Sequence, residues 1–240
     1  MAFRNLLVGL HAGPFGSAAS RGVSMAASLA VALVVLLATS IPVAAADKAL
    51  TRAQALKAIE QPAAAARRMA VERLADVGTM ADANRVAERL SDEDRLVRQL
   101  AEAALWRIWS RSGDRAIDAL QARGVEQMEA GRFDEALLTF SEIIRRKPAF
   151  AEGWNKRATL LFLMGRYEAS LKDCDEVLRR NSKHFGALSG YGQIYIRLGD
   201  YERAIDFLER ALSVNPNLPG AAATIELLER QLEERRRKTV

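Results

Sequence analysis

The sequence contains very little cysteine and histidine. Cys174 is the single cysteine among 240 residues, and the histidines are His11 and His184. One cysteine cannot form an intramolecular disulfide, and so few ligands cannot assemble a cysteine- or histidine-rich metal site. We therefore expect no metal site, and we expect Cys174 to pack as a small buried hydrophobic residue.

Motifs of catalysis and cofactor binding are also missing. The sequence has no H-E-x-x-H, G-x-S-x-G, G-x-x-x-x-G-K-[ST] or G-x-G-x-x-G, the patterns of zinc sites, serine hydrolases and nucleotide sites. Acidic groups such as Asp173, Asp175 and Glu176 are expected on solvated helix exteriors. The sequence therefore predicts a protein that is not an enzyme and uses no cofactor and no small-molecule substrate.

No strong excess of one charge is present. The chain has 35 Lys and Arg against 30 Asp and Glu, a net charge of +5, and the two signs alternate along the sequence. A nucleic-acid surface requires clustered positive charge, so we expect no nucleic-acid partner. The basic run from Arg235 to Lys238 is typical of a solvated helix C-terminus, where cations are favourable.

Charge is absent from Gly22 to Ala46. Arg4 and Arg21 precede this apolar stretch, and it ends in small residues. A positive lead, an apolar run and an A-x-A site are typical of a secretory signal peptide. We expect residues 1–46 to be removed by cleavage after Ala46, which would make the mature protein periplasmic or secreted.

An uncleaved membrane anchor is the alternative. The apolar run over 25–41 is at the short limit for a helix that spans a bilayer. If residues 22–46 stay attached, the protein would be membrane-anchored and face the periplasm. Translation can also begin at Met25 instead of Met1.

The same pattern occurs three times at a spacing of 34 residues. Aromatic residues start three similar stretches, and a glycine lies two residues before each: Gly131 and Phe133, Gly165 and Tyr167, Gly199 and Tyr201. A glycine allows a tight turn between two helices where a Cβ would clash. A small residue follows each aromatic and allows close helix approach: Ala136, Ser170 and Ala204. We expect three helix hairpins over 117–150, 151–184 and 185–218.

This spacing and the W…L-G…Y…A…F…P order resemble the tetratricopeptide repeat (TPR) family. The resemblance implies an all-α fold, a right-handed α-solenoid of three TPR units over 117–218. The sequence departs from the family pattern at three positions, which hold Arg157, Cys174 and Ser182. We expect the Arg157 head group to reach water. Residues 219–240 are expected to form a capping helix, with Ala222 among its inward residues, and a basic tail.

A fainter repetition precedes the three units. The stretches Ala66–Gly78 and Val97–Trp109 are similar at an offset of 31 residues, and a second helix is expected between them. This pattern resembles short HEAT-like helical repeats over 47–116, with a plain helical bundle as the alternative.

The TPR resemblance implies a concave groove lined by the first helix of each unit. Its positions correspond here to Gln121, Val125, Met128, Asn155, Thr159, Phe162, Ser189, Gln193 and Ile196. Amides and hydroxyls there can bond the backbone of an extended peptide. The alternative is that these are ordinary solvent-facing or inter-repeat residues. The five positions that grip acidic chaperone tails in some family members hold Gln121, Val125, Lys156, Gly186 and Gly190, so we expect no such clamp.

Two functions are compatible with these features. The first is a non-catalytic exported scaffold or adaptor that binds a protein or peptide through the TPR groove. The second is a membrane-tethered envelope assembly factor that uses the HEAT-like segment as its main contact surface.

Overall fold

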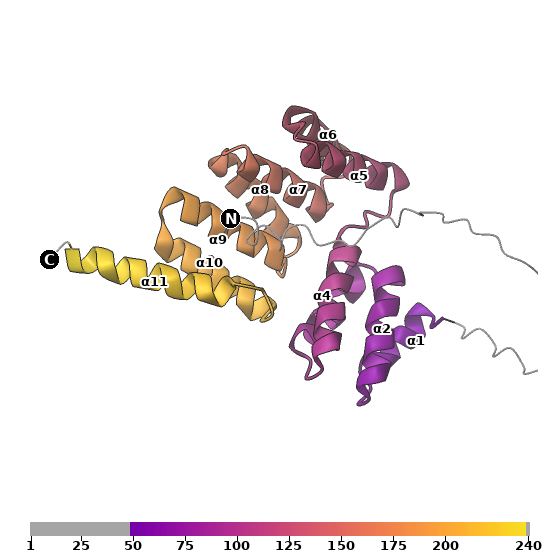
Figure 1. Ribbon diagram of the computed structural model, residues 1–240. Helices are drawn as coiled ribbons and strands as arrows, with labels where there is room; N and C mark the ends of the chain where they lie inside the picture. The colour runs from indigo at the N-terminus through magenta and orange to yellow at the C-terminus, as the bar shows by residue number, and fades with distance from the viewer. Residues whose placement is uncertain (1–48, 239–240) are drawn as a thin grey trace, which may run out of the picture.

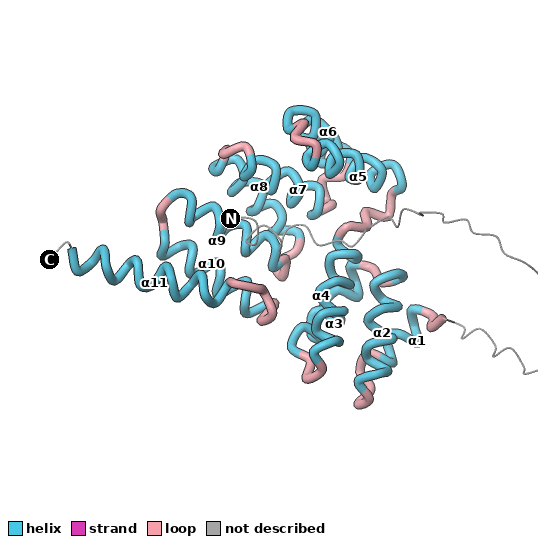
Figure 2. Tube along the Cα trace, viewed as in Figure 1, coloured by secondary structure: helices cyan, strands magenta, loops and turns pink. Residues whose placement is uncertain are grey.

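The computed structural model describes residues 49–238, and within this range the chain is helical and has no strand (Figure 2). The all-α prediction is confirmed for that part of the chain. The expected signal peptide and its cleavage site at Ala46 lie outside the described residues. None of the described helices is long and apolar enough to cross a membrane.

The N-terminal helices form a lobe beside the row of repeats (Figure 1). The stretches that resemble each other in sequence become the two long helices of this lobe, and these pack against each other. The helix expected between them is instead a five-residue α-helix between two 3₁₀ turns, which are frequent at helix termini and in connectors. The HEAT-like relation stays a prediction. The elements are α1 (Arg52–Ala58), α2 (Ala64–Val77), η3 (Met80–Asp82), α3 (Ala83–Ala87), η4 (Glu88–Ser91) and α4 (Arg95–Trp109).

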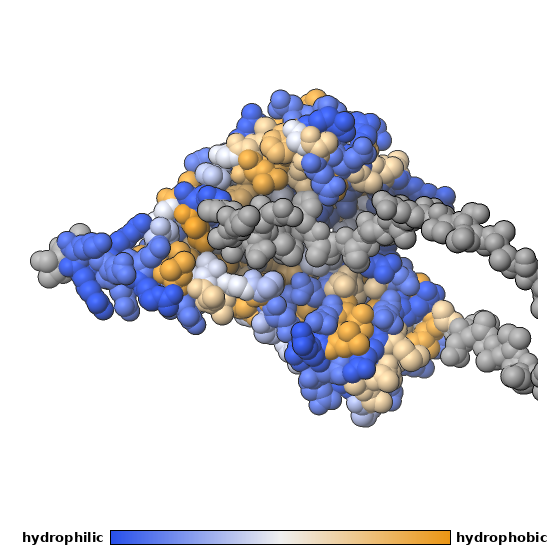
Figure 3. Space-filling model, in the orientation of Figure 1, coloured by the Kyte–Doolittle hydropathy of each residue, from blue (hydrophilic) through white to orange (hydrophobic). Residues whose placement is uncertain are grey.

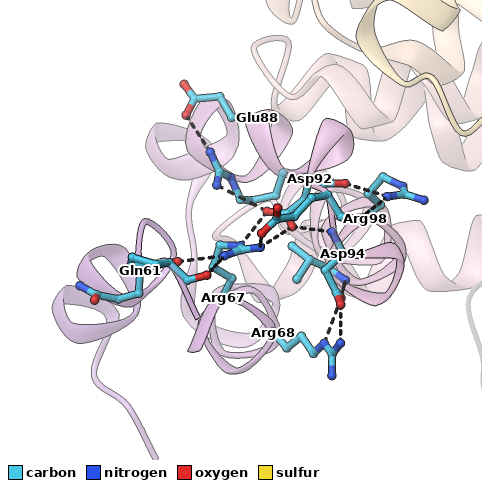
Figure 4. A network of polar contacts seen from close by, with 11 residues as sticks. Gln61, Arg67, Arg68, Glu88, Asp92, Asp94 and Arg98 are labelled. Atoms are coloured by element: carbon cyan, nitrogen blue, oxygen red, sulfur yellow. Dashed lines mark hydrogen bonds and ion pairs between the residues drawn. The ribbon is translucent and has the colours of Figure 1, made fainter. Parts of the chain in front are cut away.

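A polar network fixes α2 against α4 (Figure 4). The buried Arg67 guanidinium donates two hydrogen bonds of 2.8 Å to Asp92 and one of 3.0 Å to the Gln61 carbonyl. Its neighbour Arg68 pairs with Asp94, the N-cap residue of α4. A buried charge is tolerated when it is paired and hydrogen-bonded in this way, so the acidic turn before α4 serves as the anchor of α2.

The repeats form three helix hairpins, as the 34-residue pattern predicts. The two helices of each hairpin pack along each other, and successive hairpins are adjacent. The pairs are α5 (Arg115–Glu129) with α6 (Phe133–Arg146), α7 (Ala151–Leu163) with α8 (Tyr167–Arg180), and α9 (Phe185–Leu198) with α10 (Tyr201–Val214).

The glycine turns have the expected conformation. Gly131, Gly165 and Gly199 have φ of 72°, 72° and 77°, which lie in the left-handed region that favours glycine. In the first turn the Arg132 N–H donates to the Gln127 carbonyl at 2.8 Å, the bond that closes a helix C-terminus of this type. The prediction that glycine allows each hairpin to turn is confirmed.

The small residues lie at the closest contact of each hairpin. Ala136, Ser170 and Ala204 are fully buried, and the Ser170 hydroxyl donates to the Ala158 carbonyl across the hairpin at 2.7 Å. Cys174 is buried in the second unit as expected, and burial raises the pKa of its thiol to about 12. At neutral pH this cysteine is therefore an uncharged packing residue.

The last helix, α11 (Ala221–Lys238), covers α10. Leu228 packs into the cluster of the third unit and Ala221 is also buried, whereas Ala222, which is expected to point inward, is exposed. The prediction for Ala222 is therefore wrong, because the buried residue at this place is its neighbour Ala221. The end of α11 projects beyond the repeats and is hydrophilic (Figures 1 and 3).

Candidate partner-binding surface

The first helices of the three units lie next to each other. α7 contacts α5 on one side and α9 on the other. The nine expected groove residues occur at steps of four and then three on each helix, which places them on one face. We call this surface the inner face; its residues are Gln121, Val125, Met128, Asn155, Thr159, Phe162, Ser189, Gln193 and Ile196.

Three of these nine residues are buried. Gln121 is 9% exposed, Met128 5% and Asn155 5%. Met128 belongs to the hydrophobic cluster around Phe140, which makes it a packing residue. The other six side chains are partly exposed and are the accessible part of the inner face: Val125, Thr159, Phe162, Ser189, Gln193 and Ile196.

Two polar side chains of the accessible part have no partner. Ser189 and Gln193 make no side-chain hydrogen bond to any other residue in the range 49–238. Thr159 differs from them, because its hydroxyl donates to the Asn155 carbonyl of its own helix at 3.0 Å. An amide carries two donors and two acceptor sites, so Gln193 has its full capacity available for a ligand.

Apolar surface adjoins these polar groups. Phe162 and Ile196 are partly buried and pack beside the cluster that contains Tyr191. The Phe162 ring lies 5.7 Å from the Tyr167 ring and 6.0 Å from the Arg197 guanidinium. The inner face therefore combines hydrogen-bonding groups with a hydrophobic contact area.

A buried ionic cluster lies at the N-terminal end of α7, and the sequence analysis missed it. Glu152 is 1% exposed; Lys156 and His184 Nε2 each lie 3.2 Å from its carboxylate, and Asn155 donates to both oxygens. Burial raises the pKa of Glu152, but the charges and hydrogen bonds of these neighbours outweigh burial and lower it to about 2. The 34-residue repeat could have predicted this cluster, because it places Glu152 and His184 at the starts of α7 and α9, the first helices of consecutive units.

His184 joins this cluster to the N-terminal lobe. Its Nδ1 accepts from the Ala187 N–H at 3.1 Å, which caps α9. Its ring stacks on Trp109 of α4, with the centroids 4.4 Å apart and the planes 24° apart. Trp106 and Trp109 also contact Phe185, the first residue of α9.

Two of the three buried inner-face residues, Gln121 and Asn155, lie near the end of α4. The Gln121 amide donates to the Ser110 carbonyl directly after α4, at 3.5 Å. Asn155 lies beside Glu152 and thus next to the His184–Trp109 stack. Gln121 is therefore buried at the end of the N-terminal lobe and Asn155 in the adjoining ionic cluster, whereas Ser189, the equivalent residue of the third unit, stays accessible.

A cavity of about 660 Å³ lies between α6, α7 and α8, on another side of α7. Trp154 borders it and is partly exposed, with the guanidinium groups of Arg157 and Arg180 at 5.2 and 4.7 Å from the ring. None of the nine inner-face residues lines this cavity.

The expectations for Arg157 and Asp173 need correction. Arg157 does not direct its head group to water but donates to Asp173 at 2.7 and 2.8 Å. Asp173 is 4% exposed, so it is not on a solvated exterior, whereas Asp175 is exposed as expected. In the described part of the chain, no group of three or more His, Cys, Asp or Glu side chains is arranged to hold a metal ion.

Comparisons with known proteins agree with the repeat pattern. Residues 150–217 match the tetratricopeptide repeat family. A TPR repeat-containing protein of Rhizobium etli is 36% identical over 124 residues, which cover 52% of this chain and 61% of that protein. The Hsp70-Hsp90 organizing protein of Triticum aestivum is 29% identical over 106 residues, or 44% of this chain and 18% of that protein. The matched region thus spans less than two thirds of either relative.

Among solved structures, the Sgt2 TPR domain from Aspergillus fumigatus is similar, with a TM-score of 0.49 and 21% identity. The similarity covers 52% of this chain and 83% of that domain.

Proposed function

We propose that this chain, a tetratricopeptide repeat protein, is a non-catalytic exported scaffold that binds an extended peptide or a segment of a partner protein on the accessible part of its inner face. The observation that carries the proposal is the pair Ser189 and Gln193, which are unpaired and partly exposed beside Phe162 and Ile196. Export is supported by the sequence of residues 1–46 alone.

The chemistry of the inner face fits the backbone of a peptide. Amide and hydroxyl groups can bond peptide N–H and C=O groups, and an adjacent apolar area can accept a side chain. An acidic tail fits less well, because Lys156 is the one cation at the five clamp positions and it is paired with Glu152 at 3.2 Å. The matching wheat protein is named for organizing two other proteins, which supports a partner-binding role.

Site-specific photo-crosslinking in the source cell tests this proposal. A photoreactive amino acid at Gln193 should produce a covalent adduct with the partner. The matched control is the same amino acid at Leu138, which is 74% exposed on α6 and lies outside the inner face. Adducts at Leu138 and none at Gln193 would show that the partner binds on another side of the repeats.

The second candidate is a membrane-tethered assembly factor that uses the N-terminal lobe as its contact surface. Large hydrophobic residues are exposed on this lobe: Met69, Met80 and Leu96, at 56%, 48% and 45%. Such residues favour protein contacts when they are contiguous. Protein that resists carbonate extraction of membranes, with adducts at Met69 and none at Gln193, would favour this candidate.

A further inference from the structure

The second and third units differ at three pairs of equivalent positions. An offset of 34 residues relates Arg157 to Tyr191, Leu161 to Tyr195 and Asp173 to Phe207. The third unit holds three aromatic rings there: Tyr191 stacks on Phe207 with the centroids 4.2 Å and the planes 8° apart, and Tyr195 lies 5.7 Å from Phe207. The second unit holds no ring at these positions, and its three residues line the cavity of about 660 Å³ between α6, α7 and α8.

This cavity has the size and the apolar wall of a ligand site. We call it the outer cavity and define it by six of its lining residues: Leu137, Arg157, Leu161, Arg166, Ala169 and Lys172. The apolar wall comes from three helices, with Leu137 on α6, Leu161 on α7 and Ala169 on α8. Sites for small ligands have volumes of about 300–1,000 Å³ and combine an apolar lining with a few polar groups.

A guanidinium with a fixed orientation forms another part of the wall. Arg157 donates two hydrogen bonds to Asp173, at 2.7 and 2.8 Å, and one to Ser141 at 3.1 Å. These three bonds leave the Arg157 side chain 22% exposed. A guanidinium plane stacks well on an aromatic ring, so this group offers a preorganised flat surface to a ring that enters the cavity.

Two cations at the outer cavity have no partner. Arg166 and Lys172 are exposed, and neither side chain forms a hydrogen bond or an ion pair with any residue in the range 49–238. The lining carboxylates are all engaged: Asp173 with Arg157, Asp175 with the Tyr191 hydroxyl, and Glu176 with Arg179 and Arg180. The charge available to a ligand is therefore positive, and a carboxylate would form charge-assisted hydrogen bonds with it.

We propose that the outer cavity is a second binding site, which takes an aromatic carboxylate. The ring lies between the apolar wall and the Arg157 guanidinium, and the carboxylate pairs with Lys172 or Arg166. A free aromatic acid and a protein segment with acidic and aromatic side chains present the same groups to the cavity. This inference does not rest on the proposed function, because the outer cavity and the inner face share no residue.

The first experiment locates the binding of a probe, naphthylacetate, by NMR spectroscopy of the isotope-labelled full chain. Trp154 borders the cavity, and its indole N–H donates to the Pro148 carbonyl at 3.0 Å, whereas Trp106 and Trp109 belong to α4. Millimolar naphthylacetate should shift the indole signal of Trp154 and leave those of Trp106 and Trp109 in place. No shift at Trp154, or equal shifts of all three signals, would overturn the proposal.

The second experiment uses the third unit as a template. Arg157→Tyr/Asp173→Phe places the ring pair of the third unit in the cavity and should weaken naphthylacetate binding about tenfold or more. Arg166→Ala/Lys172→Ala keeps the cavity open but removes its free cations, and it should weaken binding by a similar factor. The control is Arg123→Ala, which removes an exposed and unpaired cation of α5 outside the cavity. Urea unfolding identifies the folded variants, and wild-type affinity in either folded double variant would overturn the proposal.

A competition experiment distinguishes the two sources of the ligand. Indoleacetate and a peptide with one tryptophan between aspartates carry the same ring and the same kind of anion. Displacement of naphthylacetate at a lower concentration of the peptide would identify a protein segment as the ligand, and the reverse order would identify a free acid. Displacement by neither compound would overturn the proposal.

Discussion

Arg157 of α7 donates two hydrogen bonds to Asp173 of α8, at 2.7 and 2.8 Å, and a third to Ser141 of α6 at 3.1 Å. These bonds connect the two helices of the second unit and link them to the first unit. Arg157 stands at a position where the repeat family prefers leucine. The structure shows that the buried carboxylate of Asp173 compensates for this departure.

Removing one partner of this pair should destabilise the repeats. In Arg157→Leu the Asp173 carboxylate stays buried without its cation, and we expect a loss on the order of 3 kcal/mol in the free energy of unfolding. The double variant Arg157→Leu/Asp173→Leu should recover most of this loss, because no charge is then left unpaired. Urea unfolding of the wild type, both single variants and the double variant measures the coupling. Additive effects would show that the two side chains act independently.

The Glu152 carboxylate should make stability depend on pH in the acid range. Its pKa of about 2 is below the ordinary value of 4.5, so its contribution to stability is complete above about pH 4.5 and is lost as the pH falls toward 2. Between these values, the stability of Glu152→Gln should fall less steeply than that of the wild type. Unfolding by urea at a series of pH values tests this expectation. The exposed variant Glu72→Gln is the control, and a wild-type slope in Glu152→Gln would contradict the account.

Ala204→Leu should destabilise the third unit. Ala204 is fully buried where α9 and α10 approach closely, and added methylenes in a packed core cost about 1–3 kcal/mol. The control is Ala222→Leu on α11, where the side chain is exposed and the melting temperature should stay within about 2 °C of the wild type. Thermal melting compares the two variants. Equal midpoints would show that the hairpin has room for the larger side chain.

Cleavage after Ala46 stays a prediction of the sequence. A bacterial host that exports the chain should yield a mature protein that begins at Asp47, because Ala44 and Ala46 meet the small-residue requirement. Intact-mass analysis decides between this form and the full-length chain. A full-length mass in the membrane fraction would support the anchored alternative.

The repeats could be predicted from sequence because their signals are local. Gly131 and its equivalents fix the turns, and Ala136, Ser170 and Ala204 mark the helix contacts, so the period alone gives the hairpins. The burial of Gln121 and Asn155 could not be predicted in this way. Gln121 bonds the Ser110 carbonyl in the connection after α4, and Asn155 bonds Glu152, whose partner His184 stacks on Trp109 of α4. The repeat period specifies none of these contacts.

The same limit explains the errors at individual side chains. Arg157 and Asp173 are 16 residues apart. Each is a charged residue that, judged from its own helix alone, is expected to be exposed. Their pairing follows from the packing of α7 on α8. Trp154 stands at the tryptophan position of the family pattern, yet it is partly exposed beside the cavity, where the guanidinium groups of Arg157 and Arg180 lie over its ring.

The central claim, that the accessible inner face binds the partner, is tested most directly by the affinity of the partner segment found by crosslinking at Gln193. Calorimetric titration should show that Gln193→Ala and Phe162→Ala each weaken binding by more than about 1 kcal/mol, which is roughly fivefold or more in Kd. Leu138→Ala should bind like the wild type, and circular dichroism should show intact helices in all three variants. Wild-type affinity in folded Gln193→Ala and Phe162→Ala would contradict the account.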